Sequence, residues 1–276
     1  MYLTYIEGEW RKGNTPLMGA MDHSVWLGSS IFDGARSVAG RLPDLRLHLQ
    51  RAIRSALELG LECPYDLDTL ERLCREGVAQ FPAEAELYIR PLVFGLEGLL
   101  VPTKSGFALT LFDAPMPKFD GFSACLSSLE RPGPHMAPTN AKASCLYPNT
   151  TRALVDAKKR GFDNAVVCDP IGNVAEFATA NLFFVDQSGQ VVTPIANGCF
   201  LSGITRARVI QLLASVDVKV CERSVRPEEL LEAKEIFNTG NFAKVLPCTK
   251  FEQHDMPIGE VTILARRLYW EFMQTC

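Results

Sequence analysis

The sequence predicts an α/β fold of the mixed, α+β kind, in which strands outnumber helices. Apolar residues make up 47% of the 276 residues, which is enough for a large core. Short apolar runs bounded by Gly, Pro, Asn and Asp recur along the whole chain, as expected of strands. Helical periods occur in fewer segments and do not alternate regularly with the strands. A regular βαβ winding is therefore not expected.

The N-terminal half is expected to combine strands with two helices. A hairpin is predicted around Glu7-Gly8-Glu9, because apolar and polar residues alternate through residues 1–12. Apolar residues at helical spacing predict a helix over residues 47–61. A second helix is predicted over residues 68–80, with Asp68 as its N-cap and Glu71 three residues further on. Further strands are expected at the end of residues 22–36 and over residues 86–94 and 107–112.

A run of helix and strand breakers at residues 114–121 separates the two halves of the chain. We therefore expect a small N-terminal α/β domain over residues 1–115, a linker and loop over 116–137, and a larger C-terminal α/β domain over 138–276. A helix over 149–160 is expected to start at Asn149 as N-cap and to end before Gly161. Two more helices are predicted over 203–214 and from about residue 258. The strands predicted here are 123–129, 164–168, 181–185, 190–193, 218–221, 235–238 and 243–250, with a tight turn at Thr239-Gly240-Asn241.

Composition excludes several classes of function. The net charge is −4 and no basic stripe occurs, so a nucleic-acid partner is not expected. The nine cysteines include no C-x-x-C pair, which favours reduced thiols in the cytoplasm over a disulfide framework. The four histidines lack metal-ligand spacing, so no metal site is expected. Neither a signal peptide nor a membrane-spanning segment is predicted.

Three features of the second half are candidates for chemistry. Lys142 lies among small residues, as a nucleophilic lysine approached by a bulky ring requires; the alternative is a solvated loop lysine. Glu176, at the end of a short strand, has the chemistry to keep a pyridine nitrogen protonated, or it is a turn glutamate in water. Ser202-Gly-Ile-Thr205 opens a helix and offers an anion site, although an ordinary helix start is commoner. Together these parts suit an aromatic aldehyde cofactor that carries a phosphate.

Arginines of the first half extend this hypothesis. Arg51 lies on an otherwise apolar helix face, where it either pairs with a phosphate or extends its charged end to water. Arg36 and Arg90 lie on strands expected to be buried, so each needs a carboxylate partner from the protein or from a substrate. Tyr88 shares a strand face with Arg90, which supports the substrate interpretation. Arg206 and Arg208, by contrast, are expected to be solvated.

The ordered set of motifs resembles fold-type IV pyridoxal-phosphate enzymes, specifically the branched-chain aminotransferase group. The resemblance extends from about Gly28 to about Pro247. The motifs that carry it are Phe32-Asp-Gly-Ala-Arg36, His48-Leu-Gln-Arg51, Tyr88-Ile-Arg90-Pro, Pro138-Thr-Asn-Ala-Lys142 with Tyr147, Gly172-Asn-Val-Ala-Glu176 with Asn181-Leu-Phe, Thr193-Pro194 and Leu201-Ser-Gly-Ile-Thr-Arg206.

The resemblance implies pyridoxal 5'-phosphate as cofactor, a site between the two domains, and a homodimer that completes it. Lys142 would form the Schiff base and serve as general acid and base. Tyr147 would bond the phenolic oxygen of the ring, and Glu176 would pair with the pyridine nitrogen. The residues that would hold the phosphate are Arg51, Ile204 and Thr205.

The resemblance also implies the substrate side and the reaction. Phe32, Arg36, Tyr88 and Arg90 would line it, and the turn Gly240-Asn241-Phe242 would face the substrate carboxylate and the phosphate. The expected reaction is transamination between a branched-chain amino acid and a 2-oxo acid such as 2-oxoglutarate. Three positions depart from the pattern of the group: Leu27 replaces a tyrosine, Leu129 replaces an aromatic residue, and Asn241-Phe242 replaces small residues.

Because of these departures, other activities on the same scaffold remain open at the level of sequence. They are an aminotransferase for D-amino acids or (R)-amines, and a lyase of the aminodeoxychorismate type. A protein that binds the phosphate without doing chemistry is the alternative from another class.

Overall fold

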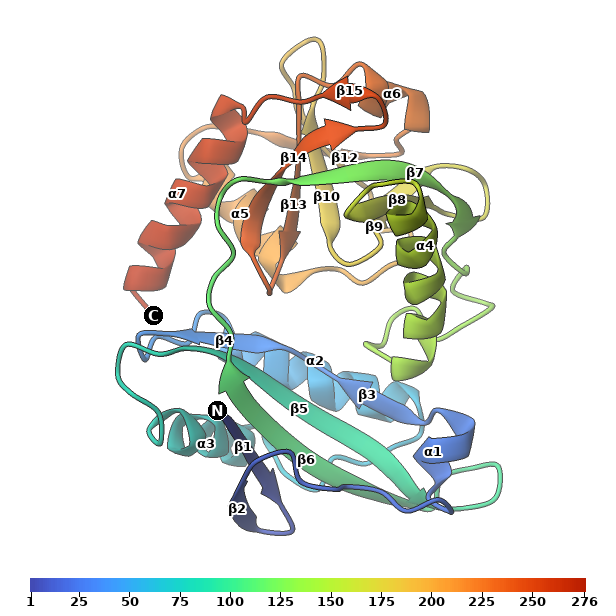
Figure 1. Cartoon of the computed structure of the whole chain (residues 1–276), viewed down its shortest axis with the longest axis vertical. Coiled ribbons are helices and arrows are strands. Elements are labelled where there is room, and N and C mark those ends of the chain that lie inside the picture. The colour runs from blue at the N-terminus through green and yellow to red at the C-terminus, as the bar shows by residue number, and fades with distance from the viewer. The chain divides into compact units, whose positions relative to one another are not determined.

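The computed structural model describes all 276 residues, which form two compact units (Figure 1). Unit 1 contains Met1–Met116, Asn140–Leu146 and Cys276, and unit 2 contains Pro117–Thr139 and Tyr147–Thr275. Each unit is built on one sheet with helices packed against it, so the predicted α/β (α+β) class is confirmed. No helix is both long and apolar enough to cross a membrane.

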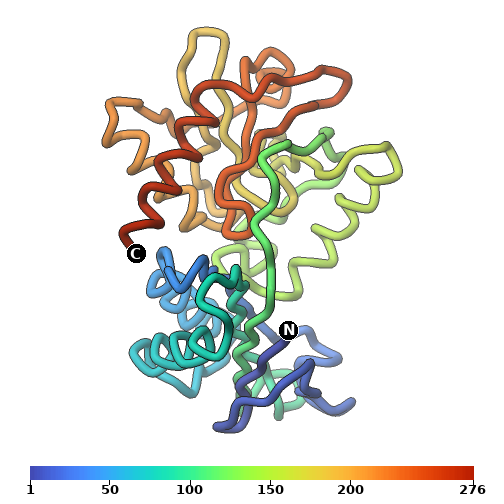
Figure 2. Tube along the Cα trace, turned by 60° about the vertical axis from the view of Figure 1, so that its left-hand side comes forward, coloured from blue at the N-terminus to red at the C-terminus, as the bar shows by residue number.

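Unit 1 is an antiparallel sheet in the order β2-β1-β6-β5-β3, with β4 also paired to β5. Two helices, α2 and α3, pack together and follow one side of these strands, as Figure 2 shows. The strands are β1 (Tyr2–Ile6), β2 (Glu9–Lys12), β3 (Ser30–Phe32), β4 (Ala35–Val38), β5 (Glu86–Glu97) and β6 (Lys104–Asp113), and the helices are α1 (His23–Leu27), α2 (Leu45–Glu58) and α3 (Leu67–Val78).

Local sequence explains most of these elements. The β1–β2 hairpin is confirmed: Glu7 and Gly8 both have positive φ, as the two central residues of a tight hairpin turn require. The N-cap predicted for α3 is wrong. Asp66, not Asp68, accepts a hydrogen bond from the Thr69 amide at 2.8 Å. Asp68 lies inside the first turn of the helix, where its side chain faces solvent.

Unit 2 is a nine-stranded mixed sheet in the order β12-β11-β10-β13-β14-β7-β8-β9, with β15 paired to β14. Helices α5 and α7 pack on each other and on β13 and β14, whereas α4 packs on β7 and β8. The strands are β7 (Phe122–Glu130), β8 (Asn164–Cys168), β9 (Val174–Phe177), β10 (Asn181–Val185), β11 (Val191–Pro194), β12 (Val220–Arg223), β13 (Glu235–Gly240), β14 (Lys244–Phe251) and β15 (His254–Asp255). The helices are α4 (Tyr147–Lys159), α5 (Ile204–Ala214), α6 (Pro227–Leu231) and α7 (Glu260–Gln274), and a 3₁₀ turn, η1 (Ser144–Leu146), belongs to unit 1.

Two local predictions for unit 2 are wrong and one is confirmed. Asn149 is not an N-cap, because α4 already begins at Tyr147; the Asn149 amide instead donates to the Glu130 carbonyl at 3.2 Å. The turn predicted at 239–241 lies two residues later, because Gly240 still pairs with Lys244 in the β13–β14 hairpin. Gly161, two residues after the last helical residue Lys159, has a φ of 86°, as predicted for the end of this helix.

The apolar face of α2 should dominate the stability of unit 1. Leu49 on this helix is fully buried in the core, whereas Leu57 is 66% exposed. We expect Leu49→Ala to lower the free energy of unfolding by about 2–5 kcal/mol, and Leu57→Ala on the same helix by about 0.5 kcal/mol or less. Denaturant unfolding of the two variants measures this difference, and equal losses would contradict the packing described.

Candidate active site

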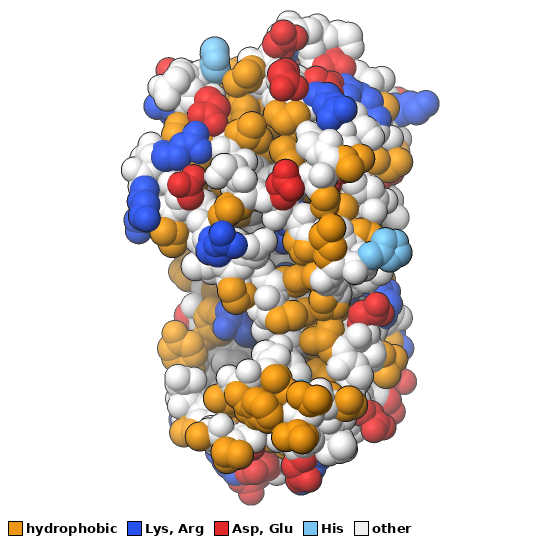
Figure 3. Space-filling view, turned by 90° about the vertical axis from the view of Figure 1, so that its right-hand side faces the viewer, with side chains coloured by type: hydrophobic (Ala, Val, Ile, Leu, Met, Phe, Trp, Pro, Cys, Tyr) orange, Lys and Arg blue, Asp and Glu red, His pale blue; other side chains and the backbone are white.

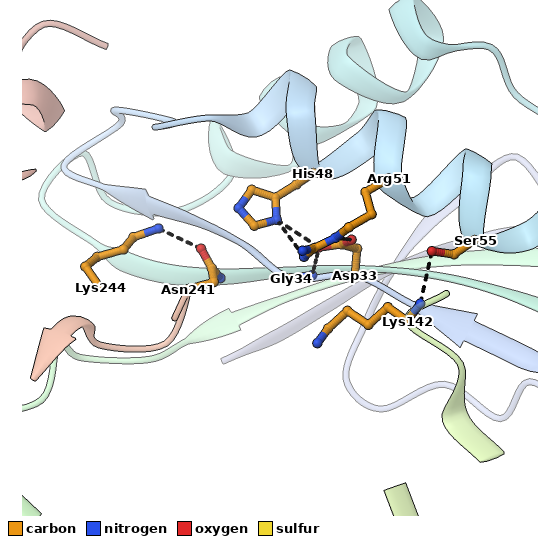
Figure 4. A network of polar contacts seen from close by, with 8 residues as sticks. All are labelled: Asp33, Gly34, His48, Arg51, Ser55, Lys142, Asn241 and Lys244. Carbon is orange, nitrogen blue, oxygen red and sulfur yellow. Dashed lines mark hydrogen bonds and ion pairs between the residues drawn. The ribbon is translucent and has the colours of Figure 1, made fainter. Parts of the chain in front are cut away.

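The backbone of Lys142 is fixed inside unit 1 (Figure 4). Its amide donates to Ser55 Oγ on α2 at 3.1 Å, and its carbonyl accepts from the Phe32 amide on β3 at 3.2 Å. The next residue, Ala143, forms a bridge with Ile31 and is fully buried. The small side chain of Ala143 fits this buried position, whereas the sequence analysis explained the small neighbours of Lys142 by the approach of a bulky ring. The ε-amine lies 5.1 Å from the centre of the Phe32 ring.

A buried ion pair lies at the break between β3 and β4. The Arg51 guanidinium donates twice to the Asp33 carboxylate, from Nε at 2.6 Å and from Nη2 at 2.8 Å. His48 Nδ1 and the Gly34 amide also contact Asp33 Oδ1, at 2.8 and 2.7 Å (Figure 4). Asp33 is inaccessible to solvent and Arg51 is only 7% exposed. The alternative of Arg51 extending to water is therefore wrong.

The electrostatics of this cluster favour the charged form of Asp33. Burial by itself raises the pKa of this carboxyl, but the Coulombic attraction and hydrogen bonds of Arg51, with a smaller contribution from His48, lower the pKa well below its ordinary value. Gly34 permits the arrangement, because a Cβ there would overlap the Tyr88 hydroxyl. The cluster therefore ties α2 to the β3–β4 break through a permanently charged pair.

The other arginines predicted for the first half differ in burial. Arg36 is fully buried and donates from Nη1 to the Ala114 carbonyl. Arg90 is exposed, so the prediction that it is buried is wrong: on β5 its neighbour Ile89 faces the core and Arg90 faces the opposite side. Its guanidinium lies 5.5 Å from the Tyr88 ring centre and 5.9 Å from that of Phe32. The shared face of Tyr88 and Arg90 is confirmed.

Glu176 on β9 is the buried carboxylate of unit 2. It is 7% exposed, so the alternative of a turn glutamate in water is wrong. Asn181 Nδ2 donates to Glu176 Oε2 at 3.1 Å and to the Leu201 carbonyl at 3.2 Å. Arg131 Nη1 lies 3.5 Å from Glu176 Oε1, and Arg131 Nε donates to the Cys199 carbonyl at 3.2 Å. The carboxylate is thus held from both sides.

Arg131 was missed by sequence reasoning. It lies in the proline-rich segment after β7, where it was assigned only to an ordered loop. Its contact with Glu176 joins residues 45 positions apart, which local sequence does not reveal.

The start of α5 presents unpaired backbone amides. Gly203 is the N-cap, and no side chain caps the helix. The amides of Ile204 and Thr205 therefore have no partner within the helix, and the helix dipole adds positive potential there. The Thr205 side chain is 3% exposed. A Cβ at Gly203 would overlap Asn181 Oδ1, so the glycine allows this helix start to lie against the side chain that orients Glu176.

Arg206 corrects another prediction. It is only 5% exposed, not solvated. Its Nη2 donates to the Glu222 carboxylate at 2.6 Å and to the Pro194 carbonyl at 2.9 Å, and its Nε donates to Thr193 Oγ1 at 3.2 Å. These contacts tie the first turn of α5 to the parallel strands β11 and β12. Arg208 is half-buried, with its guanidinium 4.3 Å from the Phe272 ring centre.

The turn between β13 and β14 completes the set predicted for unit 2. Asn241 Oδ1 accepts from Lys244 Nζ at 2.6 Å, and Phe242 is 57% exposed. The turn lies near Asn181, because Thr239 pairs with Asn181 across β13 and β10. Tyr147 is half-buried at the first position of α4. Within unit 2, the structure thus gathers Glu176 and the α5 start around Asn181, with the Asn241 turn on the neighbouring strand. Within unit 1, it gathers Phe32, Arg51, Tyr88, Arg90 and Lys142 around β3 and β5.

Known proteins are similar to this chain in sequence and in fold. The family described as amino-transferase class IV matches residues 30–251. A probable branched-chain-amino-acid aminotransferase of Rickettsia bellii is 30% identical, over 89% of this chain and 86% of that protein. An aminotransferase of Brucella abortus, solved with bound pyridoxal phosphate, is 46% identical with a TM-score of 0.97 over 99% of both chains. A branched-chain aminotransferase of Thermoproteus uzoniensis, solved with norvaline, is 27% identical with a TM-score of 0.93 over 99% of this chain and 95% of that one.

The match covers well over half of the chain, so the fold and these similarities together define an aminotransferase. The chain belongs to the class IV aminotransferases, a family of pyridoxal-phosphate enzymes. The family, the enzyme class and the cofactor predicted from the sequence are thereby confirmed.

The Asp33 cluster makes the stability of unit 1 depend on pH. Because the pKa of Asp33 is lowered in the folded protein, its contribution is fully present above the pH at which an unfolded aspartate titrates, about 4, and is lost as the pH falls below that. We expect Asp33→Asn, which leaves Arg51 buried without its counter-charge, to cost about 3–5 kcal/mol of unfolding free energy at neutral pH.

The pH profile of that variant separates charge from packing. Asp33→Asn should lose less additional stability than the wild type below about pH 4, because its residue 33 no longer titrates. Asp68→Asn is the control, because this side chain is 81% exposed. Its unfolding free energy should depend on pH as that of the wild type does. Parallel acid profiles for the wild type and Asp33→Asn would contradict this account.

Proposed function

We propose that this enzyme uses pyridoxal 5'-phosphate to transfer the amino group of a branched-chain amino acid to a 2-oxo acid such as 2-oxoglutarate. The observation that carries the proposal is the cluster in unit 2. There Asn181 holds the buried Glu176 carboxylate and also lies against the uncapped start of α5. A buried acid and an anion-binding helix start, joined by one side chain, suit a cofactor with a basic ring nitrogen at one end and a phosphate at the other.

The residues present fit this cofactor. Glu176 would hold the pyridine nitrogen, and its contacts with Asn181 and Arg131 would keep the carboxylate charged and oriented. The amides of Ile204 and Thr205 would bind the phosphate, with Arg51 as a further donor. Lys142 would bind the aldehyde carbon covalently through Nζ, and Tyr147 would donate to the phenolic oxygen. When bound, pyridoxal phosphate supplies the aldehyde that takes up the amino group and the ring that accepts the electron pair.

Lys142 carries the proton transfers in this proposal. Its Nζ would accept the α-proton of the amino donor and would hold it for return during the transfer. One positioned base of this kind typically contributes about 10²–10⁴-fold to the rate. The hydrogen bonds of the Lys142 backbone to Ser55 and Phe32 support this role, because they limit the volume that the ε-amine can sample.

The substrate side is proposed for the face of unit 1 that carries Phe32, Tyr88 and Arg90. The Phe32 and Tyr88 rings suit a branched apolar side chain, and the exposed Arg90 guanidinium beside them suits the second carboxylate of 2-oxoglutarate. Arg36, fully buried behind Tyr88, would hold this face in place. The names of the Rickettsia and Thermoproteus proteins favour a branched-chain donor over D-amino acids, (R)-amines or a lyase reaction.

We further propose a homodimer in the cytoplasm. Hydrophobic side chains gather on the face of unit 1 shown in Figure 3. Those on and near α1 include Met21 and Trp26, at 85% and 48% exposure, and the β5–β6 loop adds Leu99, Leu100 and Val101, at 70–77%. An apolar surface of this kind favours association with a second copy.

The cysteines support the cytoplasm as the compartment. None of the nine cysteines forms a disulfide, which suits a reducing compartment.

Covalent attachment of the cofactor tests the role of Lys142. Borohydride reduction of the enzyme mixed with pyridoxal phosphate should add one cofactor mass to the peptide that contains Lys142, as measured by mass spectrometry of a digest. Lys142→Ala should carry no adduct and lose at least about 10³-fold in turnover. The control, Lys158→Ala on α4, should keep the adduct at Lys142 and the wild-type turnover. An adduct on the buried Lys244 instead would refute the assignment.

The donor class is tested by single half-reactions. L-leucine should convert the yellow enzyme to the pyridoxamine phosphate form much faster than D-alanine or an (R)-amine does, as followed by absorbance in a stopped-flow instrument. The product form should then return to yellow with 2-oxoglutarate, and Arg90→Met should slow this second step more than the first. Conversion by D-alanine with none by L-leucine would overturn the branched-chain proposal.

A further inference from the structure

Lys244 is an unusual residue that the sequence analysis did not single out. It is fully buried, and its φ of 62° lies in the left-handed region that residues with a side chain rarely adopt. Its position follows the β13–β14 turn, where it pairs with Gly240. Burying the amino group and holding the backbone in the left-handed region each cost stability. Contacts of the surrounding structure must therefore hold Lys244 in this position, which suggests a functional role.

The contacts of Lys244 determine how the neighbouring amide is oriented. Lys244 Nζ donates to Asn241 Oδ1 at 2.6 Å (Figure 4) and lies 5.4 Å from the centre of the buried Tyr269 ring on α7. An ammonium group has only donors, so only the oxygen of the Asn241 amide can face it. The orientation of this amide, which is otherwise ambiguous between oxygen and nitrogen, is therefore fixed by Lys244.

The fixed amide leaves a donor without an acceptor. Asn241 Nδ2 is inaccessible to solvent and has no hydrogen-bond partner in the protein. A buried donor without a partner costs about 1–3 kcal/mol, and such groups in native structures call for an explanation, of which a ligand is one. The Lys244 amino group donates to the oxygen of the same amide. The acceptor that fits an unpaired donor in such a donor-rich setting is an anionic oxygen.

We propose that Lys244 is a positioning residue: it locks the Asn241 amide so that Nδ2 donates to an anionic oxygen of a ligand. The inference rests on the proposed function, which supplies two such oxygens, the carboxylate of the amino acid and the phosphate of the cofactor. Lys244 itself does not touch the ligand. It acts through Asn241, and the turn would bind an anion through a side chain oriented by a lysine.

A double-mutant cycle tests this arrangement. Lys244→Met keeps the apolar stem and removes the donor, whereas Asn241→Ala removes the amide. Two properties are measured for the wild type, both single variants and the double variant: the KM and kcat for L-leucine, and the Kd for pyridoxamine 5'-phosphate by fluorescence titration. Each single variant should raise the same constant, either the KM or the Kd, about tenfold or more. In the double variant this constant should be no higher than in Asn241→Ala alone. Lys250→Met on the same strand is the matched control and should leave both unchanged.

The measured property identifies the ligand. A rise in KM with kcat and the Kd for pyridoxamine phosphate unchanged assigns the substrate carboxylate, and a rise in that Kd assigns the phosphate. Lys244→Gln, whose amide can also donate to Asn241, should show a smaller effect than Lys244→Met. It replaces Lys244→Met if circular dichroism shows that the methionine variant does not fold. Additive losses in the double variant, or no loss in Lys244→Met, would overturn the inference. A wild type that neither binds pyridoxamine phosphate nor turns over L-leucine would instead reject the proposed function.

Discussion

The position of the Lys142 ε-amine depends on how the backbone of this residue is held. The segment Asn140–Leu146 belongs to unit 1, although the chain on both sides of it belongs to unit 2. It is fixed there by hydrogen bonds to Ser55 on α2 and Phe32 on β3 and by the bridge between Ile31 and Ala143. A lysine on a mobile loop would lose conformational entropy each time it is positioned for catalysis. Here the backbone of Lys142 loses that entropy once, when the protein folds.

The same elements carry the buried charge of unit 1. Asp33 interrupts the edge between β3 and β4 and joins it to α2 through Arg51 and His48, and α2 also supplies Ser55. In unit 2, Glu176 is held by Asn181 and Arg131 in a similar way. In both units a buried carboxylate is compensated by an arginine and by further donors, which is the condition for keeping it charged away from water. Two separate polar clusters thus make rigid supports out of groups that would otherwise be costly to bury.

Sequence patterns predicted the features that depend on neighbouring residues. The Glu7-Gly8 hairpin turn, the apolar face of α2 and the glycine after α4 all follow from local backbone and packing preferences. The start of α3 was misplaced because Asp66 and Asp68 are both good caps, and only the actual backbone at Asp66 distinguishes them. Glu176 and Arg51 were recognised as candidates, but their burial was left open, because it depends on partners distant in sequence.

The features that were missed depend on long-range pairing. Arg206 resembles a solvated residue near a helix start, yet its partners come from β11 and β12, which meet only through a parallel pairing. Arg131 and Lys244 gave no recognisable local signal, because their importance arises from the contact of Arg131 with Glu176 and from the hydrogen bond of Lys244 to Asn241. The resemblance to a family located the candidate site in sequence, whereas the contacts of these residues required the folded chain.

A crystal structure of the protein grown with pyridoxal 5'-phosphate tests the central claim most directly. We expect continuous density from Lys142 Nζ to the cofactor ring, the ring nitrogen within hydrogen-bond distance of the Glu176 carboxylate, and the phosphate at the amides of Ile204 and Thr205. Density that attaches the cofactor to another lysine, or a ring nitrogen that faces a group other than Glu176, would contradict it.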